Sequence, residues 1–259
     1  MWPGRPVPPD GPVRLERLHW IIGQDNLCHL QAAAPDLAER LLVGPETIVV
    51  RRSPESQIPD RGVPMDLFTS YDQFARLIRR DAIPTQIRAV AYDPESWAAT
   101  PAPERHDPMR YLALFARTAR AHGYRPVLAP GRDLTLTPGG SCEKRRGERV
   151  GEAYLRCGVP GSAELAAIFV IQAAPVELDL PQLRHLVAEG ARQARAANPS
   201  VVVTATLSTA PGRVRADPDA IARAARTMLP YVEGFMLNLT RATTAEAVAF
   251  LRALSTGSA

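Results

Sequence analysis

Short apolar runs and longer amphipathic stretches follow one another along the whole chain. The apolar runs are rich in β-branched residues and predict seven strands, at 18–24, 46–52, 87–93, 124–130, 166–172, 200–207 and 232–239. Between them Leu, Ala and Phe recur at helical spacing, with Arg or Glu elsewhere. This second pattern predicts helices near 35–43, 71–80, 108–122, 147–157, 180–197, 217–229 and 243–254.

Helix start and stop signals agree with these boundaries. Gly123 follows the predicted helix 108–122, and the pair Asn198 and Pro199 follows the helix 180–197. Asp107 offers a side-chain cap in front of Pro108, which suits the first position of a helix. The elements are therefore expected to begin and end within a few residues of the predicted positions.

Strict alternation of strands and helices indicates an α/β protein, because parallel strands must be joined by right-handed crossovers. Seven or eight such units over about 240 residues favour a single (β/α)8 TIM-like barrel, irregular where an eighth strand is not obvious. The short segment at 64–68, PMDLF, is the candidate for that strand. An open Rossmann-type sheet is the alternative, although no GxGxxG follows the first strand and GxxxxGK[ST] is absent.

Composition narrows the class of protein. The 259 residues are 46% hydrophobic and 22% charged, which is typical of a globular domain, so we expect a flexible Pro-rich segment at 1–14 and one barrel domain at 15–255. The net charge of +4 is spread along the predicted helices, which argues against a nucleic-acid partner. No apolar run is long enough to span a membrane and no signal core opens the chain, so a cytoplasmic location is expected.

Cysteine and histidine spacing predicts no metal site, and no cofactor is expected. Cys142 and Cys157 lie fifteen residues apart across a loop and a helix. Two free thiols in a reducing compartment and a disulfide in an oxidising one both fit this spacing.

Polar residues close every predicted strand, and in a barrel the loops that follow the strands converge on the active site. The candidates in chain order are Gln24, Asp25, Asn26, Arg51, Arg52, Asp93, Glu95, Arg132, Asp133, Gln172, Ser208, Thr209, Asn238 and Thr240. Gln172 and Asn238 are the most informative, because each ends an otherwise apolar run. We expect Asp93, Glu95, Asp133, Gln172 and Asn238 to line one cavity.

The strand at 87–93 presents Asp93 in a position suited to proton transfer. Period-two alternation places Ala89, Ala91 and Asp93 on one face of the strand and Val90 and Tyr92 on the other. An acid at the barrel mouth, crowded by apolar walls, would have a raised pKa. Glu95 is a second candidate on the same loop, whereas Glu104 and His106 are interpreted as loop or helix-cap residues.

Asp133 supplies another carboxylate one strand further on, so a carboxylate pair of the kind used in glycoside hydrolysis is conceivable. The later strands end in Ser208 and Asn238 instead of an acid, which argues against an ordinary glycosidase. Arg51, Arg52 and the basic segment 144–149 could make the mouth electropositive and favour an anionic small-molecule substrate. Trp97 could stack on a sugar or line an apolar pocket.

Several ordered blocks carry a resemblance to a known family: YDPESWAATPAPERHDP at 92–108, CEKRRGERVGEAYLRC at 142–157, FVIQ at 169–172, AANP with LSTAPG within 196–212, and GFMLNL at 234–239. Together they resemble a family of actinobacterial TIM-barrel-like proteins without a settled activity. The resemblance covers about residues 87–240. It implies a barrel whose mouth holds Asp93, Glu95, Asp133, Gln172 and Asn238.

The same resemblance implies a Cys142–Cys157 disulfide and relatives that are exported. The chain departs from the family pattern at Arg105, where the family has Gln, and this departure puts a role of the Glu104–Arg105 pair in doubt.

The sequence thus predicts a small-molecule enzyme of specialised metabolism, a cyclase, lyase or isomerase. Asp93, Asp133 and Glu95 would be its acid/base residues, and Gln24, Arg51, Trp97, Arg132, Gln172, Ser208 and Asn238 would contact the substrate. A glycosidase-like hydrolase and a non-catalytic barrel that binds a metabolite or carbohydrate are the alternatives.

Overall fold

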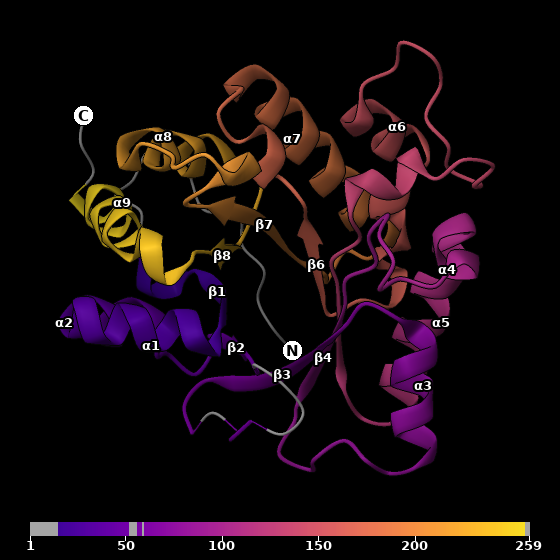
Figure 1. Ribbon diagram of the computed structural model, residues 1–259, viewed down its shortest axis with the longest axis horizontal. Coiled ribbons are helices and arrows are strands. Elements are labelled where there is room, and N and C mark those ends of the chain that lie inside the picture. Colours follow the sequence, from indigo (N-terminus) through magenta and orange to yellow (C-terminus); the bar gives the residue numbers. More distant parts are fainter. Residues whose placement is uncertain (1–14, 52–55, 59, 257–259) are drawn as a thin grey trace. The chain divides into compact units, whose positions relative to one another are not determined.

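A computed structural model describes residues 15–51, 56–58 and 60–256 of the protein. The predicted flexible segment at 1–14 and Arg52 lie outside the described residues. The described strands form a closed parallel barrel in sequence order (Figure 1). They are β1 (His19–Gly23), β2 (Ile48–Val50), β3 (Val63–Phe68), β4 (Ala89–Tyr92), β5 (Arg125–Leu128), β6 (Ile168–Ile171), β7 (Val202–Ser208) and β8 (Gly234–Asn238).

Helices follow most of the strands as the sequence predicts, whereas the described residues between β2 and β3 form no helix. They are α1 (Gln24–Ala33), α2 (Pro35–Leu42), α3 (Tyr71–Arg79), α4 (Ala102–His106), α5 (Pro108–Ala121), α6 (Val150–Arg156), α7 (Leu180–Ala197), α8 (Pro218–Met228) and α9 (Thr244–Thr256). Short 3-10 helices also occur, at η1 (Leu15–Arg17), η2 (Arg132–Leu136), η3 (Val159–Leu165), η4 (Ala174–Val176), η5 (Pro211–Arg213) and η6 (Arg241–Thr243).

The predicted α/β barrel is confirmed, and so is the candidate for its eighth strand at 64–68. All seven predicted strand segments contain a strand, and the eighth is β3, which contains the segment PMDLF. The open-sheet alternative is wrong because β1 pairs with β8, with Trp20 opposite Phe235 and Ile22 opposite Leu237. Helices α1 and α4 were not predicted, since their residues show no clear amphipathic repeat.

Within the closed barrel the described residues group into two compact units. One comprises those of Met1–Pro64, Ala173–Ala188 and Thr204–Ala259, and the other comprises Met65–Gln172 and Glu189–Val203. In the first unit α1 packs against α2 and α9, and α8 packs against α9. In the second unit α5 packs against α3, α4 and β5 (Figure 1).

An aromatic cluster forms the core of the second unit beside β3 and β4. Phe68 and Tyr92 from the strands meet Phe74 of α3 and Phe115 of α5, with ring centroids 4.4 Å apart for Phe74 and Phe115 and 5.0 Å apart for Tyr92 and Phe115. Tyr92 therefore faces the helices. Strand alternation then turns Ala91 and Asp93 to the opposite face, as the sequence predicts.

Local signals explain where the helices of this unit begin. The Ser70 side chain accepts a hydrogen bond from the Gln73 N–H at the start of α3, and Asp107 accepts one from the Arg110 N–H at the start of α5. Pro108 occupies the first turn of α5, where a missing N–H costs nothing. The predicted Asp107–Pro108 cap is confirmed.

Candidate acid cluster at the ends of β4, β5 and β6

Backbone hydrogen bonds continue past the strands and hold the first residues of neighbouring loops together. The Asp93 N–H donates to the Phe68 carbonyl at 2.8 Å, and the Ala129 N–H donates to the Tyr92 carbonyl at 2.9 Å. One step further, the Gly131 N–H donates to the Pro94 carbonyl at 2.8 Å. The loops that follow β4 and β5 therefore leave the barrel paired, which fixes the backbone under Asp93.

Asp93 is held from the next strand by Gln172. The Gln172 Nε2 donates to Asp93 Oδ1 at 3.0 Å and to the Ala129 carbonyl at 3.2 Å. A backbone carbonyl can only accept, so it fixes which end of the Gln172 amide carries the N–H groups. No described residue donates to Asp93 Oδ2, which leaves this oxygen for a proton or a substrate.

The electrostatic setting of Asp93 raises its pKa to about 7. Burial is the largest cause, the charge of Glu95 adds to it, and the charge of Asp133 adds a smaller part. The hydrogen bond from Gln172 acts in the opposite direction, because it stabilises the ionised form. Asp93 is thus a carboxyl group that both loses and gains a proton near neutral pH.

Glu95 and Asp133 complete a cluster of three acids, called the acid cluster below. Burial raises the pKa of Glu95, with the charge of Asp133 as the second cause. Burial also raises the pKa of Asp133, although hydrogen bonds from backbone N–H groups oppose this. One of them comes from Ser96, whose N–H donates to Asp133 Oδ2 at 3.0 Å. The three acids therefore disfavour full ionisation of the cluster.

Gly131 allows these acids to approach each other. A Cβ atom at this position would lie 2.8 Å from Glu95 Cγ and 3.1 Å from the Pro94 carbonyl oxygen, and it would also collide with Asp133 Oδ1. Atoms cannot pack that closely, so a residue other than glycine would push Glu95 and Asp133 apart. The sequence analysis did not single out Gly131, whose use here depends on tertiary contact.

The far end of the β4 loop is anchored through Glu104, which is 1% exposed. Its carboxylate accepts hydrogen bonds from the Tyr92 hydroxyl at 2.6 Å, the Ser70 hydroxyl at 3.0 Å and two N–H groups of α3, the shorter from Tyr71 at 2.7 Å. This agrees with the interpretation of Glu104 as a helix cap, although the helix it caps is α3. Arg105 donates to the carbonyls of Trp97 and Thr100 at 2.8 and 2.6 Å and so holds the same loop.

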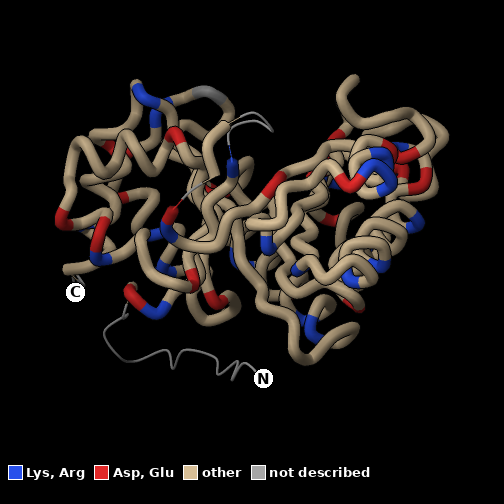
Figure 2. The backbone as a smooth tube through the Cα atoms, turned by 90° about the horizontal axis from the view of Figure 1, so that it is seen from below, with Lys and Arg blue, Asp and Glu red and all other residues tan. Residues whose placement is uncertain are grey.

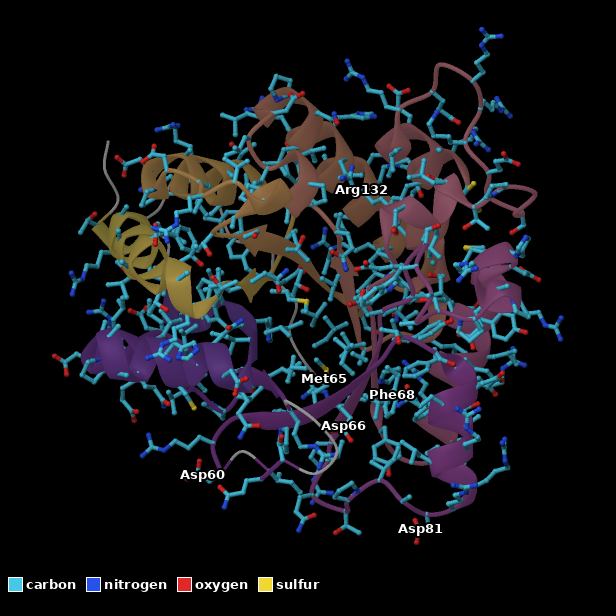
Figure 3. The ribbon with its side chains drawn as sticks, in the orientation of Figure 1. Asp60, Met65, Asp66, Phe68, Asp81 and Arg132 are labelled. Atoms are coloured by element: carbon cyan, nitrogen blue, oxygen red, sulfur yellow. The ribbon has the colours of Figure 1, made fainter. Side chains whose placement is uncertain are left out.

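Arg132 and Tyr154 lie beside the acid cluster with unpaired polar groups. Arg132 begins η2, directly before Asp133, and is 8% exposed. Its side chain is labelled in Figure 3. Its Nε has no acceptor among the described residues, and the Tyr154 hydroxyl of α6 is likewise buried without a partner. Arg132 was predicted from the sequence. Tyr154 was not, because it looks like an ordinary core position of an amphipathic helix.

The remaining predicted substrate contacts of the barrel mouth belong to the first compact unit. The Gln24 side chain donates to the Gln57 carbonyl at 3.3 Å, Arg51 is 6% exposed, Ser208 ends β7 and Asn238 ends β8. These residues are described within that unit alone. Their common cavity with Asp93 stays a prediction.

Glu177 of the first unit was missed by the sequence analysis. It follows η4, is 1% exposed, and accepts a hydrogen bond from the Ser208 N–H at 2.9 Å through Oε2. Its Oε1 has no hydrogen-bond partner among the described residues, and burial raises its pKa to about 8. Nothing in the stretch 173–179 marked this acid, because its burial depends on the fold of the chain around it.

Other predicted features lie at the surface. Trp97 is 52% exposed, and its carbonyl, not its ring, makes the contact with Arg105. Arg145, Arg146 and Arg149 of the basic segment are also exposed. Basic and acidic positions are interspersed over the described backbone (Figure 2). The electropositive mouth expected from this segment stays a prediction.

Cys142 and Cys157 are free thiols in the structure, so the disulfide implied by the resemblance is not formed. Burial raises the pKa of Cys142 to about 12, and a hydrogen bond with Cys157 contributes. Over residues 15–51, 56–58 and 60–256, no group of three or more His, Cys, Asp or Glu is arranged to hold a metal ion. No described helix combines the length and the apolar character needed to cross a membrane.

Comparison of the chain with protein-family models and with curated proteins gives no match. The resemblance to an actinobacterial family therefore stays a prediction.

Proposed function

We propose that the protein is a small-molecule enzyme that uses the acid cluster for proton transfer, in a reaction of the lyase, isomerase or cyclase type. The observation that carries this proposal is Asp93, whose pKa is raised to about 7 and whose Oδ1 is held by Gln172 at 3.0 Å. General acid/base catalysis works best when the pKa of the group lies near the working pH.

Each member of the site has a distinct part in the proposed reaction. Asp93 in its ionised form removes a proton from the substrate through Oδ2, and in its protonated form returns that proton to another substrate atom. Gln172 keeps Oδ1 fixed, which restricts the side chain to one orientation. The nearby charges of Glu95 and Asp133 favour the protonated form of Asp93 and so keep both forms populated.

Catalysis is favoured over a purely structural role by the arrangement around Asp93. A carboxylate that served only as a cap would be expected to accept several N–H bonds, as Glu104 does here. Asp93 instead accepts one side-chain bond and lies beside two other acids, an arrangement that costs stability and is common at catalytic sites. The glycosidase and binding-barrel alternatives have no specific observation in their favour.

Deuterium exchange tests the proposal without knowledge of the full reaction. The purified protein is incubated in D2O with a panel of 2-oxo acids, 2-hydroxy acids and sugar phosphates, and loss of the signal of each acidic C–H is followed by proton NMR. A proton-transfer enzyme should introduce deuterium at one carbon of one class of compound. Positioned acid/base groups contribute about 10²–10⁴-fold, so Asp93→Asn should slow exchange by that factor.

The matched control is Asp219→Asn, which removes an exposed carboxylate of α8 and should exchange like wild type. Exchange that persists in Asp93→Asn would refute the role of Asp93. Absence of exchange across the panel, together with hydrolysis of an aryl glycoside by wild-type protein, would favour the glycosidase alternative and overturn the proposal.

A further inference from the structure

Arg132 combines a permanent positive charge with burial and a lack of partners. Arg132 is 8% exposed, and its Nε–H is buried without an acceptor. No described residue forms a hydrogen bond or ion pair with its guanidinium group. Asp133 is its neighbour in the chain, but that carboxylate accepts from the Ser96 N–H instead. The charge of Asp133 acts on Arg132 without a direct contact, but buried guanidinium N–H groups that lack acceptors are unfavourable in a folded protein.

Tyr154 provides a second unpaired donor in the same region. It lies on α6, which packs against η2, and its hydroxyl is buried with no hydrogen-bond partner among the described residues. Arg132 and Tyr154 are close enough for the charge of one to influence the pKa of the other. Buried hydroxyl and guanidinium groups normally find partners, so two unpaired donors together indicate a ligand that accepts.

We infer that Arg132 and Tyr154 form an oxyanion-binding subsite that holds a carboxylate or phosphate group of the substrate. The planar guanidinium group presents several N–H donors to such an anion and can bind it through two parallel hydrogen bonds. The phenolic O–H adds a donor without adding charge. A neutral sugar would offer these donors no charged acceptor.

The position of this subsite connects it to the acid cluster. Arg132 and Asp133 are consecutive residues of η2, so an anion on Arg132 is anchored next to the carboxylates. The link between the subsite and the acid cluster rests on the proposed proton-transfer function, whereas binding of the anion itself does not.

Calorimetric titration of the full-length protein tests the subsite, with inorganic phosphate and acetate as separate probes and sodium chloride at equal ionic strength as the reference. Wild-type protein should bind one probe with a stoichiometry of one, and the better probe identifies phosphate or carboxylate as the recognised group. Arg132→Gln should weaken that binding by about 10- to 100-fold, the range for hydrogen bonds to a charged group. Tyr154→Phe should weaken it by several-fold.

Two controls separate the possible failures. Arg146→Gln removes an exposed cation of the basic segment 144–149 and should bind like wild type. Asp93→Asn should lose deuterium exchange but keep anion binding, so failure of the proposed catalysis does not affect the outcome. Absence of binding of either probe to wild type would overturn the inference, as would equal binding by wild type and Tyr154→Phe.

Arg132→Gln carries an additional readout that does not require a ligand. If the guanidinium group is buried and unpaired, the variant should have a higher melting temperature than wild type in chloride and a smaller rise in phosphate or acetate. A variant that melts at a lower temperature in every buffer would show that Arg132 serves the fold, which contradicts the inference.

Discussion

Replacing Asp93 by Asn should make the protein more stable at alkaline pH and leave its stability nearly unchanged at acid pH. The pKa of Asp93 is raised from 3.8 to about 7 in the folded protein. The folded state therefore binds a proton more tightly than the unfolded chain does. Stability falls as the pH rises from about 4 to about 7 and stays at the lower level above that range.

The size of the effect follows from the shift. About three pKa units at about 1.36 kcal/mol each give a penalty of about 4 kcal/mol once Asp93 is ionised. Because the side chain keeps some contact with solvent, we expect about 2–4 kcal/mol. Asn is close in shape, accepts the same hydrogen bond from Gln172 and never ionises, so it removes this penalty.

Urea unfolding at pH 4 and at pH 8, followed by circular dichroism, measures the prediction. The free energy of unfolding of Asp93→Asn minus that of wild type should increase by about 2–4 kcal/mol between the two pH values. Asp219→Asn should show no such increase, because its carboxylate is exposed. A difference for Asp93→Asn that is the same at both pH values would refute the raised pKa and the acid/base role built on it.

Three further predictions concern other buried groups. Glu104→Ala should lower the free energy of unfolding, measured by urea titration, by about 3 kcal/mol or more, because it leaves buried donors without an acceptor. A loss under about 1 kcal/mol would contradict the anchoring role of Glu104. Glu177 has a pKa raised to about 8 in the folded protein, so wild type loses stability as the pH rises from 4 to 9 and Glu177→Gln does not. The free energy of unfolding of Glu177→Gln minus that of wild type should therefore be larger at pH 9 than at pH 4, and an equal difference at both pH values would contradict the raised pKa. Iodoacetamide should modify the exposed Cys28 well before Cys142, whose pKa is raised to about 12, and mass spectrometry follows both modifications. Equal rates would show that Cys142 is accessible and ionised.

The fold could be predicted from sequence because its signals are local and repeated. Most strands are short apolar runs, and caps such as Asp107 mark where helices start. Helix α1 escaped prediction because the residues that follow Gly23, QDN, resemble a loop. The second compact unit also could not be foreseen, since it is defined by contacts between segments far apart in the chain.

The candidate site was predicted only where position along a strand carries the information. Asp93 and Gln172 each close a buried strand of the barrel, and the structure joins them by a hydrogen bond of 3.0 Å. Tyr154 and Glu177 have no such positional signal. Their importance comes from burial and from missing partners, and both properties depend on tertiary packing that no short pattern encodes.

The anchoring of the β4 loop at both ends has a consequence for how substrates are selected. Pro94 is tied to Gly131 at the start of the loop, and Glu104 is tied to α3 and Tyr92 at its end. A segment held in this way is poorly suited to act as a closing lid, so in the proposed enzyme the β4 loop should contribute a preformed wall to substrate recognition. Stopped-flow binding to the proposed enzyme should then show no separate conformational phase that arises from this loop.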